Sequence, residues 1–290
     1  MKDKLSNDSK IMKRIFALLT IAVLFFWTSC NTDTKEIVYG SNNGKHVDIL
    51  NTKIYYEEYG KGMPLLLLSG GGMHRSIKDF EKCIPELAKH YRVIAPDTPG
   101  QGRSALPDSI TYQVLTEFMS QLIDLLKIDS AYVMGWSDGA IVGILLAEKR
   151  PDKIRKVIVV GPNNGAKGFA LPPGITLDSV KPMTLNQFEK NNGEMIEQYV
   201  KTLPRDWKRL INGLNKMWYA QEYFSDSVYT RIHIPVMIVL GDRDEISIEH
   251  GIEIYRKTKG SQYCVLPNTT HEVFAEKPDL INKIAIDFFK

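Results

Sequence analysis

The sequence of 290 residues is poor in cysteine, in long hydrophobic runs and in runs of one charge. Of three cysteines, Cys83 and Cys264 lie beyond the N-terminal region, and one pair does not make a disulfide framework, so we expect two buried thiols. Outside the N-terminus no stretch is rich in lysine and arginine, and the net charge is only +3, which argues against nucleic-acid binding. We find no internal repeat and no low-complexity segment.

The longest hydrophobic run, residues 15–27, is too short to span a membrane comfortably. It follows Lys13 and Arg14 and precedes Thr28-Ser29-Cys30, an arrangement that is typical of a signal peptide. The end of the run resembles a bacterial lipoprotein signal, in which the cysteine is lipidated and becomes the mature N-terminus. We therefore expect residues 1–29 to be a signal peptide and Cys30 to anchor an exported cell-envelope lipoprotein to a membrane. The alternatives are a secreted soluble protein and an uncleaved anchor.

The predicted signal peptide also accounts for the net charge. Residues 1–29 carry five positive and two negative charges, so their removal leaves 3 − 3 = 0. The mature chain therefore has a net charge of zero, and its overall charge does not attract partners of one sign. Residues 30–44 are polar and rich in Thr, Asn and Gly, which predicts a tether.

Beyond the tether, short apolar stretches alternate with helical patterns, which predicts an α/β fold with a mostly parallel sheet covered by helices on both faces. The alternation stops in residues 162–229, which are rich in aromatic side chains and contain helical patches but no clear buried strand. We interpret this segment as an inserted helical cap over a core domain of residues 45–161 and 230–290, at the strand ends where ligands bind in such sheets. Strands are predicted at 47–50, 53–58, 64–68, 91–95, 131–134, 154–160, 236–240 and 262–266, and core helices at 77–90, 112–127, 140–149, 247–259 and 279–290.

The stretch Gly135-Trp136-Ser137-Asp138-Gly139 joins a predicted buried strand to a predicted helix. In this setting G-x-S-x-G is typical of a nucleophile elbow, a tight turn that holds a serine hydroxyl above the sheet. The two glycines leave room where the strand and the helix pass close together. Free N–H groups at the start of the helix face any charge that develops beside Ser137. We therefore predict that Ser137 is a nucleophile.

A serine hydroxyl needs a general base, and the base needs an acid that orients it. Of six histidines, His271 follows the last predicted strand in a loop at the C-terminal edge of the sheet, and it comes after the serine, as the order Ser…Asp…His requires. His74 precedes the serine and is the one serious rival for a place in the site. Two acids, Asp242 and Asp244, follow the strand that ends at Leu240, and the residues alone leave both open as the orienting acid.

Together these motifs resemble those of the α/β-hydrolase fold enzymes, over roughly residues 46–290. The resemblance implies a serine hydrolase that uses no cofactor and no metal, with Asp244 favoured over Asp242 as the acid. It also implies an oxyanion hole made by the backbone N–H groups of Gly71 and Asp138. Besides the elbow, the resemblance rests on Ser69-Gly70-Gly71-Gly72, on the turn at residues 97–104, on Gly241-Asp242-Arg243-Asp244 and on Thr270-His271-Glu272 with Pro278.

The predicted reaction is hydrolysis of a small carboxylic ester through an acyl-enzyme at Ser137. Asp138 leaves a second hypothesis open, because a carboxylate beside a developing oxyanion opposes catalysis unless the substrate carries a cation. The elbow resembles that of family members that cleave amino-acid esters, which implies that Asp138 binds an ammonium group; the alternative is that it only stabilises the start of a helix. Amide or peptide hydrolysis, acyl transfer and a non-catalytic binding lipoprotein are further alternatives. Other candidate substrate-binding residues are Gly70, Gly72, His74, Trp136, Asn163 and Trp218.

Overall fold

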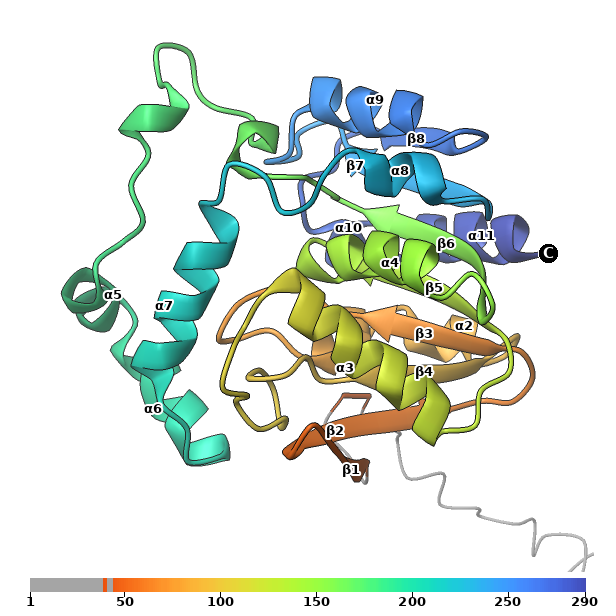
Figure 1. The fold of residues 1–290 in the computed structure, drawn as a ribbon, viewed down its shortest axis with the longest axis horizontal. Helices are drawn as coiled ribbons and strands as arrows, with labels where there is room; N and C mark the ends of the chain where they lie inside the picture. Colours follow the sequence, from red (N-terminus) through yellow and green to blue (C-terminus); the bar gives the residue numbers. More distant parts are fainter. Residues whose placement is uncertain (1–38, 41–43) are drawn as a thin grey trace, which may run out of the picture. The chain divides into compact units, whose positions relative to one another are not determined.

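The computed structural model describes residues 39–40 and 44–290, so the predicted signal peptide, Cys30 and most of the predicted tether lie outside it. In the described part, an eight-stranded sheet has the order β1-β2-β4-β3-β5-β6-β7-β8 (Figure 1). The β1–β2 and β2–β4 pairs are antiparallel, and all other pairs are parallel. The strands are β1 (Lys45–Ile49), β2 (Thr52–Tyr59), β3 (Pro64–Leu68), β4 (Arg92–Pro96), β5 (Ala131–Trp136), β6 (Ile154–Val160), β7 (Val236–Gly241) and β8 (Gln262–Leu266).

The central strands are buried on both faces, as their apolar sequences predict. In β3, Leu66 and Leu68 contribute to one hydrophobic cluster, whereas Leu65 and Leu67 contribute to the other. Helices α3, α4, α8 and α9 cover the first face, and α2, α10 and α11 cover the second (Figure 1). The helices and 3₁₀ turns are η1 (Ile77–Phe80), α2 (Ile84–Leu87), α3 (Tyr112–Leu125), α4 (Asp138–Lys149), η2 (Ala166–Gly168), η3 (Leu177–Ser179), α5 (Leu185–Asn191), α6 (Gly193–Thr202), α7 (Trp207–Trp218), α8 (Ser227–Arg231), α9 (Ile248–Lys257), α10 (Val273–Glu276) and α11 (Pro278–Phe289).

The prediction of a single helix over residues 77–90 is wrong. The chain forms the 3₁₀ turn η1 and then a separate short helix, α2. Pro85 lies in the first turn of α2 and has no N–H to donate to a preceding turn, so a continuous helix cannot pass through it. The start of η1 is held instead by Asp97, whose Oδ1 accepts a 2.9 Å hydrogen bond from the N–H of Ile77.

The segment between β6 and β7 contains helices and no strand. Helices α5, α6 and α7 lie together at one end of the sheet and form the cap (Figure 1). The cap is fastened to the core where Tyr199 donates a 2.8 Å hydrogen bond to the carbonyl of Gly100 and Arg205 donates a 2.9 Å bond to the carbonyl of Ser104. Helix α8 packs against α4 and α9 of the core. These features confirm the predicted α/β-hydrolase fold with an inserted helical cap.

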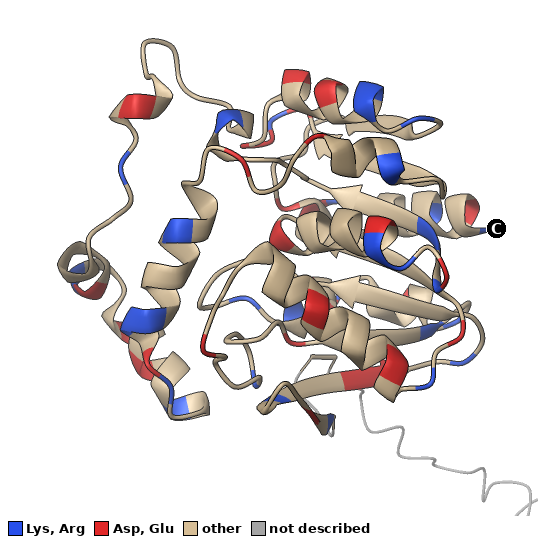
Figure 2. Ribbon diagram, viewed as in Figure 1, with Lys and Arg blue, Asp and Glu red and all other residues tan. Residues whose placement is uncertain are grey.

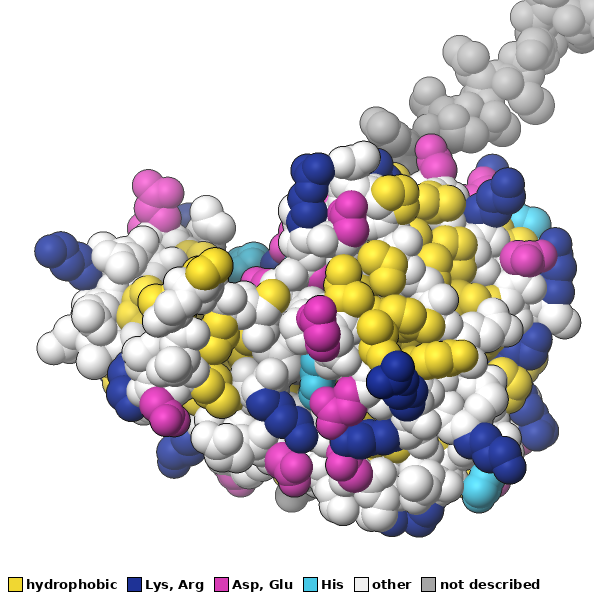
Figure 3. Space-filling view, turned by 90° about the horizontal axis from the view of Figure 1, so that it is seen from above, with side chains coloured by type: hydrophobic (Ala, Val, Ile, Leu, Met, Phe, Trp, Pro, Cys, Tyr) yellow, Lys and Arg dark blue, Asp and Glu magenta, His cyan; other side chains and the backbone are white. Residues whose placement is uncertain are grey.

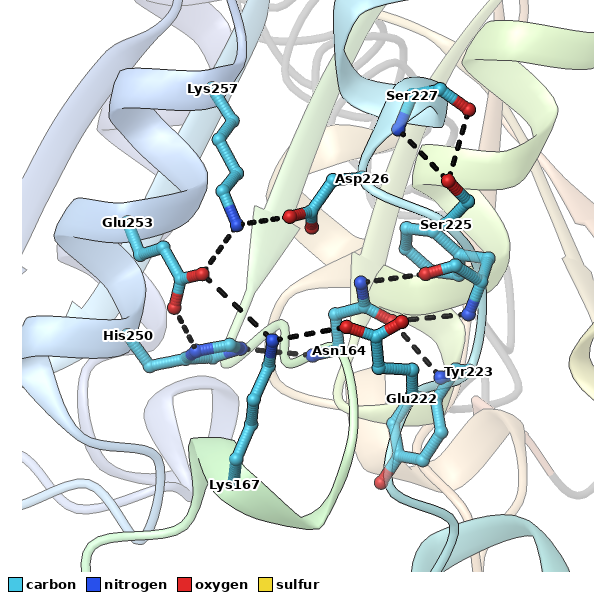
Figure 4. Close-up of polar contacts among 11 residues, drawn as sticks. Asn164, Lys167, Glu222, Tyr223, Ser225, Asp226, Ser227, His250, Glu253 and Lys257 are labelled. Atoms are coloured by element: carbon cyan, nitrogen blue, oxygen red, sulfur yellow. Dashed lines mark hydrogen bonds and ion pairs between the residues drawn. The ribbon is translucent and has the colours of Figure 1, made fainter.

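A polar network joins the chain that follows β6 to helix α9 (Figure 4). The N–H of Asn164 donates a 3.0 Å hydrogen bond to Nε2 of His250, so Nδ1 must carry the proton that it shares with Glu253 at 3.0 Å. Lys257 in turn pairs with Glu253 and, at 2.6 Å, with Asp226. Burial lowers the pKa of His250 and outweighs the opposing effect of Glu253. The network therefore depends on a neutral His250.

Basic and acidic residues are interspersed along the chain in the ribbon of Figure 2, and neither sign of charge dominates in that view. Figure 3 shows hydrophobic side chains gathered on the face seen from above. Strand β8 forms the open edge of the sheet, and its Tyr263, Cys264 and Val265 are half-buried. The thiol of Cys83 is buried as predicted, whereas Cys264 is more exposed than predicted because it lies on this edge. No described helix has the length and apolar character needed to cross a bilayer.

Candidate active site

Ser137 occupies a tight turn between β5 and α4. Its backbone has φ 54° and ψ −118°, a conformation that non-glycine residues rarely adopt and that stores strain. A Cβ atom on Gly135 would lie 2.2 Å from the carbonyl oxygen of Gly139, and one on Gly139 would lie 2.1 Å from that of Leu68. Only glycine permits these approaches, so the strand, the turn and the helix form the close-packed geometry of a nucleophile elbow.

His271 and Asp244 form a buried pair at the same edge of the sheet. Their Nδ1 and Oδ1 atoms are 2.7 Å apart, and the side chain of Asp244 is fully buried. Asp244 is oriented by the backbone, since it accepts hydrogen bonds from the N–H groups of Ile246 at 2.9 Å and of Gly241 at 3.3 Å. Burial lowers the pKa of His271, but the hydrogen bond and charge of Asp244, helped by nearby glutamates, outweigh it and raise the pKa.

Asp242, the other acid that the sequence left open, faces solvent. Its Oδ1 accepts a 2.9 Å hydrogen bond from the N–H of Thr269, and hydrogen bonds from the backbone of Thr269 and Asn268 lower its pKa. Among the described residues it forms no hydrogen bond or ion pair with His271, and it ties the acid loop to the histidine loop. The structure therefore brings Asp244, and not Asp242, to the histidine.

The second ring nitrogen of His271 is available for chemistry. Nε2 is buried and has no hydrogen-bond partner among residues 39–40 and 44–290. The ring packs closely over the chain after β6, because a Cβ on Gly161 would lie 2.5 Å from its Cε1 atom. Ser137 is fixed next to the same chain, since its N–H donates a 2.8 Å hydrogen bond to the carbonyl of Val160. No hydrogen bond joins the two side chains in the described structure, and such bonds commonly form only when substrate is present.

A cavity of about 350 Å³ opens beside Ser137. The predicted residues Gly71, Asp138, Asn163 and Trp218 line it together with the serine. Its walls are mainly apolar. Among the described residues, the charged side chains that line it are those of Asp138 and Glu245, and no lysine or arginine lines it. Further lining residues are Tyr112, Ala166, Phe169, Ala170, Leu171, Leu177, Val180, Tyr219, Tyr223, Glu245 and Ile246.

The side chain of Asp138 is buried against the loop that follows β3. A Cβ on Gly71 would lie 1.8 Å from its Oδ2, which explains the need for glycine there. Tyr112 donates a 2.8 Å hydrogen bond to Oδ1, and the indole of Trp218 donates to both oxygens at 3.1 and 2.9 Å. Burial raises the pKa of Asp138, while the two donors oppose the shift. Asp138 therefore links the elbow to the C-terminal end of cap helix α7 through neutral donors.

Four predicted substrate-binding residues do not line this cavity: Gly70, Gly72, His74 and Trp136. Trp136 is a clear correction, because it is only 2% exposed and its indole donates a 2.9 Å hydrogen bond to the carbonyl of His271. It belongs to the core and holds the histidine loop beside the elbow. His74 is exposed, and desolvation together with the charge of Arg75 lowers its pKa.

Sequence reasoning missed Tyr112 and Glu245, which both line the cavity. Tyr112 begins α3, far along the chain from the elbow, and no local pattern marks it. Glu245 follows Asp244 directly, so the prediction that the acid loop contributes to the site could have drawn attention to it.

A larger cavity, of about 640 Å³, lies between residues 107–113 and helix α7. It shares Tyr112 and Tyr223 with the catalytic cavity but does not reach Ser137. Within the described ranges, no group of three or more His, Cys, Asp or Glu side chains is placed to hold a metal ion.

Comparison with known proteins agrees with this geometry. Residues 63–202 match the family model for the alpha/beta hydrolase fold. A solved structure of a meta-cleavage product hydrolase from Pseudomonas fluorescens IP01 superposes with a TM-score of 0.69 at 18% identity, covering 85% of this chain and 97% of that one. A 2-hydroxy-6-oxo-6-phenylhexa-2,4-dienoate hydrolase from Burkholderia cepacia is 23% identical over 264 residues, or 82% of this chain and 91% of that protein.

The chain has the α/β-hydrolase fold, and its relatives support a hydrolase. The Gly-Trp-Ser-Asp-Gly elbow resembles that of valacyclovir hydrolase, which is also among the relatives. That enzyme, human serine hydrolase BPHL, is 23% identical over 252 residues, which cover 84% of this chain and 85% of BPHL.

Proposed function

We propose that the protein is a serine hydrolase that cleaves a small carboxylic ester through an acyl-enzyme at Ser137. The observation that carries the proposal is the 2.7 Å contact of buried Asp244 with Nδ1 of His271, at the edge where the elbow presents the serine. A proton on Nδ1 that is donated to Asp244 leaves a lone pair on Nε2, the atom that must accept the proton of the Ser137 hydroxyl.

The reaction begins when the Ser137 oxygen attacks the ester carbonyl and its proton passes to Nε2 of His271. Asp244 stabilises the imidazolium, and the backbone N–H groups of Gly71 and Asp138 bind the oxyanion. The imidazolium then protonates the departing alcohol, which leaves the acyl group on the serine. Water attacks the acyl-enzyme with His271 again as base, and this step releases the acid and restores Ser137.

The charge of the cavity favours substrates whose acyl group is neutral or cationic. Asp138 and Glu245 line it, and no cationic side chain does so in the described chain. Several relatives are named as hydrolases of dienoates, which carry a carboxylate. A carboxylate bound here would face two acids without a counter-charge, which costs free energy. The cavity therefore supports ester cleavage over carbon–carbon cleavage of a dienoate.

A second candidate is an amino-acid ester whose ammonium group binds Asp138. Asp138 is 4% exposed and lies at the cavity, and its carboxylate receives hydrogen bonds from the neutral side chains of Tyr112 and Trp218. A buried charge without a counter-charge is costly, and a cationic substrate would supply the missing partner.

The test compares a free α-amino ester with its N-acetylated form, alongside simple chromogenic esters of increasing acyl length. Asp138→Asn removes the charge but keeps an acceptor for Tyr112 and Trp218. If Asp138 binds ammonium, the wild type prefers the free amine and Asp138→Asn loses that preference while it still cleaves the acetylated ester. If the wild type turns over both forms equally, the amino-acid ester candidate is rejected and hydrolysis of simple esters remains the proposed function. Cleavage of no ester by the wild type contradicts the proposed function.

A further inference from the structure

Glu245 lies at the mouth of the catalytic cavity, directly after the acid of the triad. Its side chain is 65% exposed, and its Oε1 lies 3.6 Å from Nε2 of His271. The backbone around it is fixed, because its carbonyl accepts a 2.7 Å hydrogen bond from the N–H of Ala170, while Ile246 donates to Asp244 and bridges to Phe169. The carboxylate is therefore held near the reactive nitrogen without being buried.

The charges around His271 act at different places on the ring. Asp244 binds Nδ1, and Glu272 is neutralised by Arg75 in a 2.6 Å ion pair. Asp138, which also acts on His271 through its charge, is engaged by Tyr112 and Trp218. Two carboxylates of the described structure form ion-pair contacts with the ring, and of these Glu245 is the one that approaches Nε2. Nε2 has no hydrogen-bond partner among the described residues.

We propose that Glu245 is a positioning residue that pairs with the imidazolium form of His271 at Nε2 and so raises the pH at which this histidine becomes a base. While the imidazolium is paired with Glu245, its Nε2 carries a proton and cannot accept one from Ser137. A nearby negative charge favours the protonated form of a histidine, and burial by itself favours the neutral form. With Glu245 present, His271 should therefore lose its proton and become active as a base at a higher pH than it would with Asp244 alone. The inference rests on the proposed function, since it requires His271 to be the base.

The effect of Glu245 is electrostatic and lies at an exposed position, so it should be weakened by salt. Because Glu245 is exposed, its change to glutamine should not disturb the fold. Glu249, four residues further along the chain, is a matched control, because Glu249→Gln removes the same charge from a residue that forms no ion pair with His271 in the described structure.

The experiment follows the rate of covalent labelling by a fluorophosphonate against pH, in wild type, Glu245→Gln and Glu249→Gln. This rate reports the protonation of the free enzyme and needs no knowledge of the natural substrate. In Glu245→Gln the acidic midpoint should move down by roughly 0.5–1 pH unit, so that labelling on the acidic side rises roughly three- to tenfold. Glu249→Gln should keep the midpoint of the wild type.

Added salt should move the midpoint of the wild type towards that of Glu245→Gln and should move that of Glu245→Gln less. The salt series needs only the wild type, so it tests the inference even if a variant folds poorly. Equal midpoints in wild type and Glu245→Gln would overturn the inference, as would an equal shift in Glu249→Gln or a wild-type midpoint that salt leaves unchanged. A wild type that is never labelled contradicts the proposed function itself, which keeps the two failures distinct.

Discussion

Asp242 and Asp244 lie on one loop, two residues apart, in opposite surroundings. The side chain of Asp244 is fully buried and contacts His271, whereas Asp242 faces solvent and accepts a hydrogen bond from the backbone of Thr269. A buried carboxylate that is bonded to a histidine fixes the tautomer of the ring and stabilises the imidazolium that forms during attack. An exposed carboxylate bound to the backbone shapes the turn.

This contrast predicts different costs for two matched substitutions. Asp244→Asn should lower kcat on the order of 10³–10⁴-fold, because the amide no longer stabilises the imidazolium or the productive tautomer. Asp242→Asn keeps most of its turn contacts and should lower kcat by less than about tenfold. Steady-state kinetics on a chromogenic ester, with circular dichroism as a control for folding, measure both. The opposite ranking would make Asp242 the acid.

At the scale of single residues, the sequence predicts those that belong to a recognisable motif. Ser137 and His271 follow from the elbow and from the position of the histidine after the last strand. The role of Tyr112 could not be predicted, because it depends on where distant segments meet at the cavity, whereas Glu245 directly follows a predicted acid. Trp136 was misplaced since a residue next to the nucleophile can face either the cavity or the core, and only packing decides which.

At the scale of helices and strands, solid apolar runs were the easiest to predict. The bounds of β3 and β6 agree with prediction, because a strand buried on both faces has a distinctive composition. The helix expected over residues 77–90 fails at Pro85, because this proline has no N–H to donate and lies in the first turn of a new helix, α2. Hydrophobic spacing alone does not show where backbone hydrogen bonds stop.

The contact between α9 and the chain after β6 predicts a dependence of stability on pH. His250 accepts a hydrogen bond from Asn164 and is neutral in the folded state, and its pKa is lowered by burial. The unfolded chain then binds a proton more readily, so stability should be lost as the pH falls below about 6.5. The loss should be about 1.4 kcal/mol for each unit by which the pKa is lowered.

Denaturant unfolding of wild type and His250→Gln between pH 5 and 8 measures this contribution, since glutamine can still accept from Asn164 but does not titrate in this range. The wild type should lose stability relative to the variant as the pH falls. His271 acts in the opposite sense, because its raised pKa adds stability below about 6.5 that is lost as the pH rises through the folded value. The variant keeps His271, so the difference isolates His250. Parallel curves would contradict the prediction.

At the scale of the whole molecule, the cap and the sheet together define the site. The indole of Trp218 in cap helix α7 donates a hydrogen bond to Asp138, the residue that follows Ser137 in the core. The cap therefore contacts the elbow directly at the cavity. The alternation of strands and helices predicts this architecture, because each segment must bury its apolar side against another layer. The charge of the cavity could not be predicted from one segment, since Asp138 and Glu245 lie far apart in the sequence.

The predicted lipid anchor is also a property of the whole chain. If Cys30 is lipidated, the mature protein should partition into the detergent phase of a Triton X-114 separation, since acyl chains carry roughly 0.8 kcal/mol for each buried CH₂ group. Cys30→Ser should move it to the aqueous phase. Detection of a mature N-terminus at a residue other than Cys30 by mass spectrometry would contradict the prediction.

The measurement that tests the central claim most directly is the site of covalent labelling by a fluorophosphonate. Intact-mass and peptide mass spectrometry should find one label on each chain, attached to Ser137. Ser137→Ala should take up no label and should lose turnover by on the order of 10³-fold or more while it keeps its fold. A wild type that stays unlabelled, a label on another residue, or full ester turnover by Ser137→Ala would contradict an acyl-enzyme at this serine.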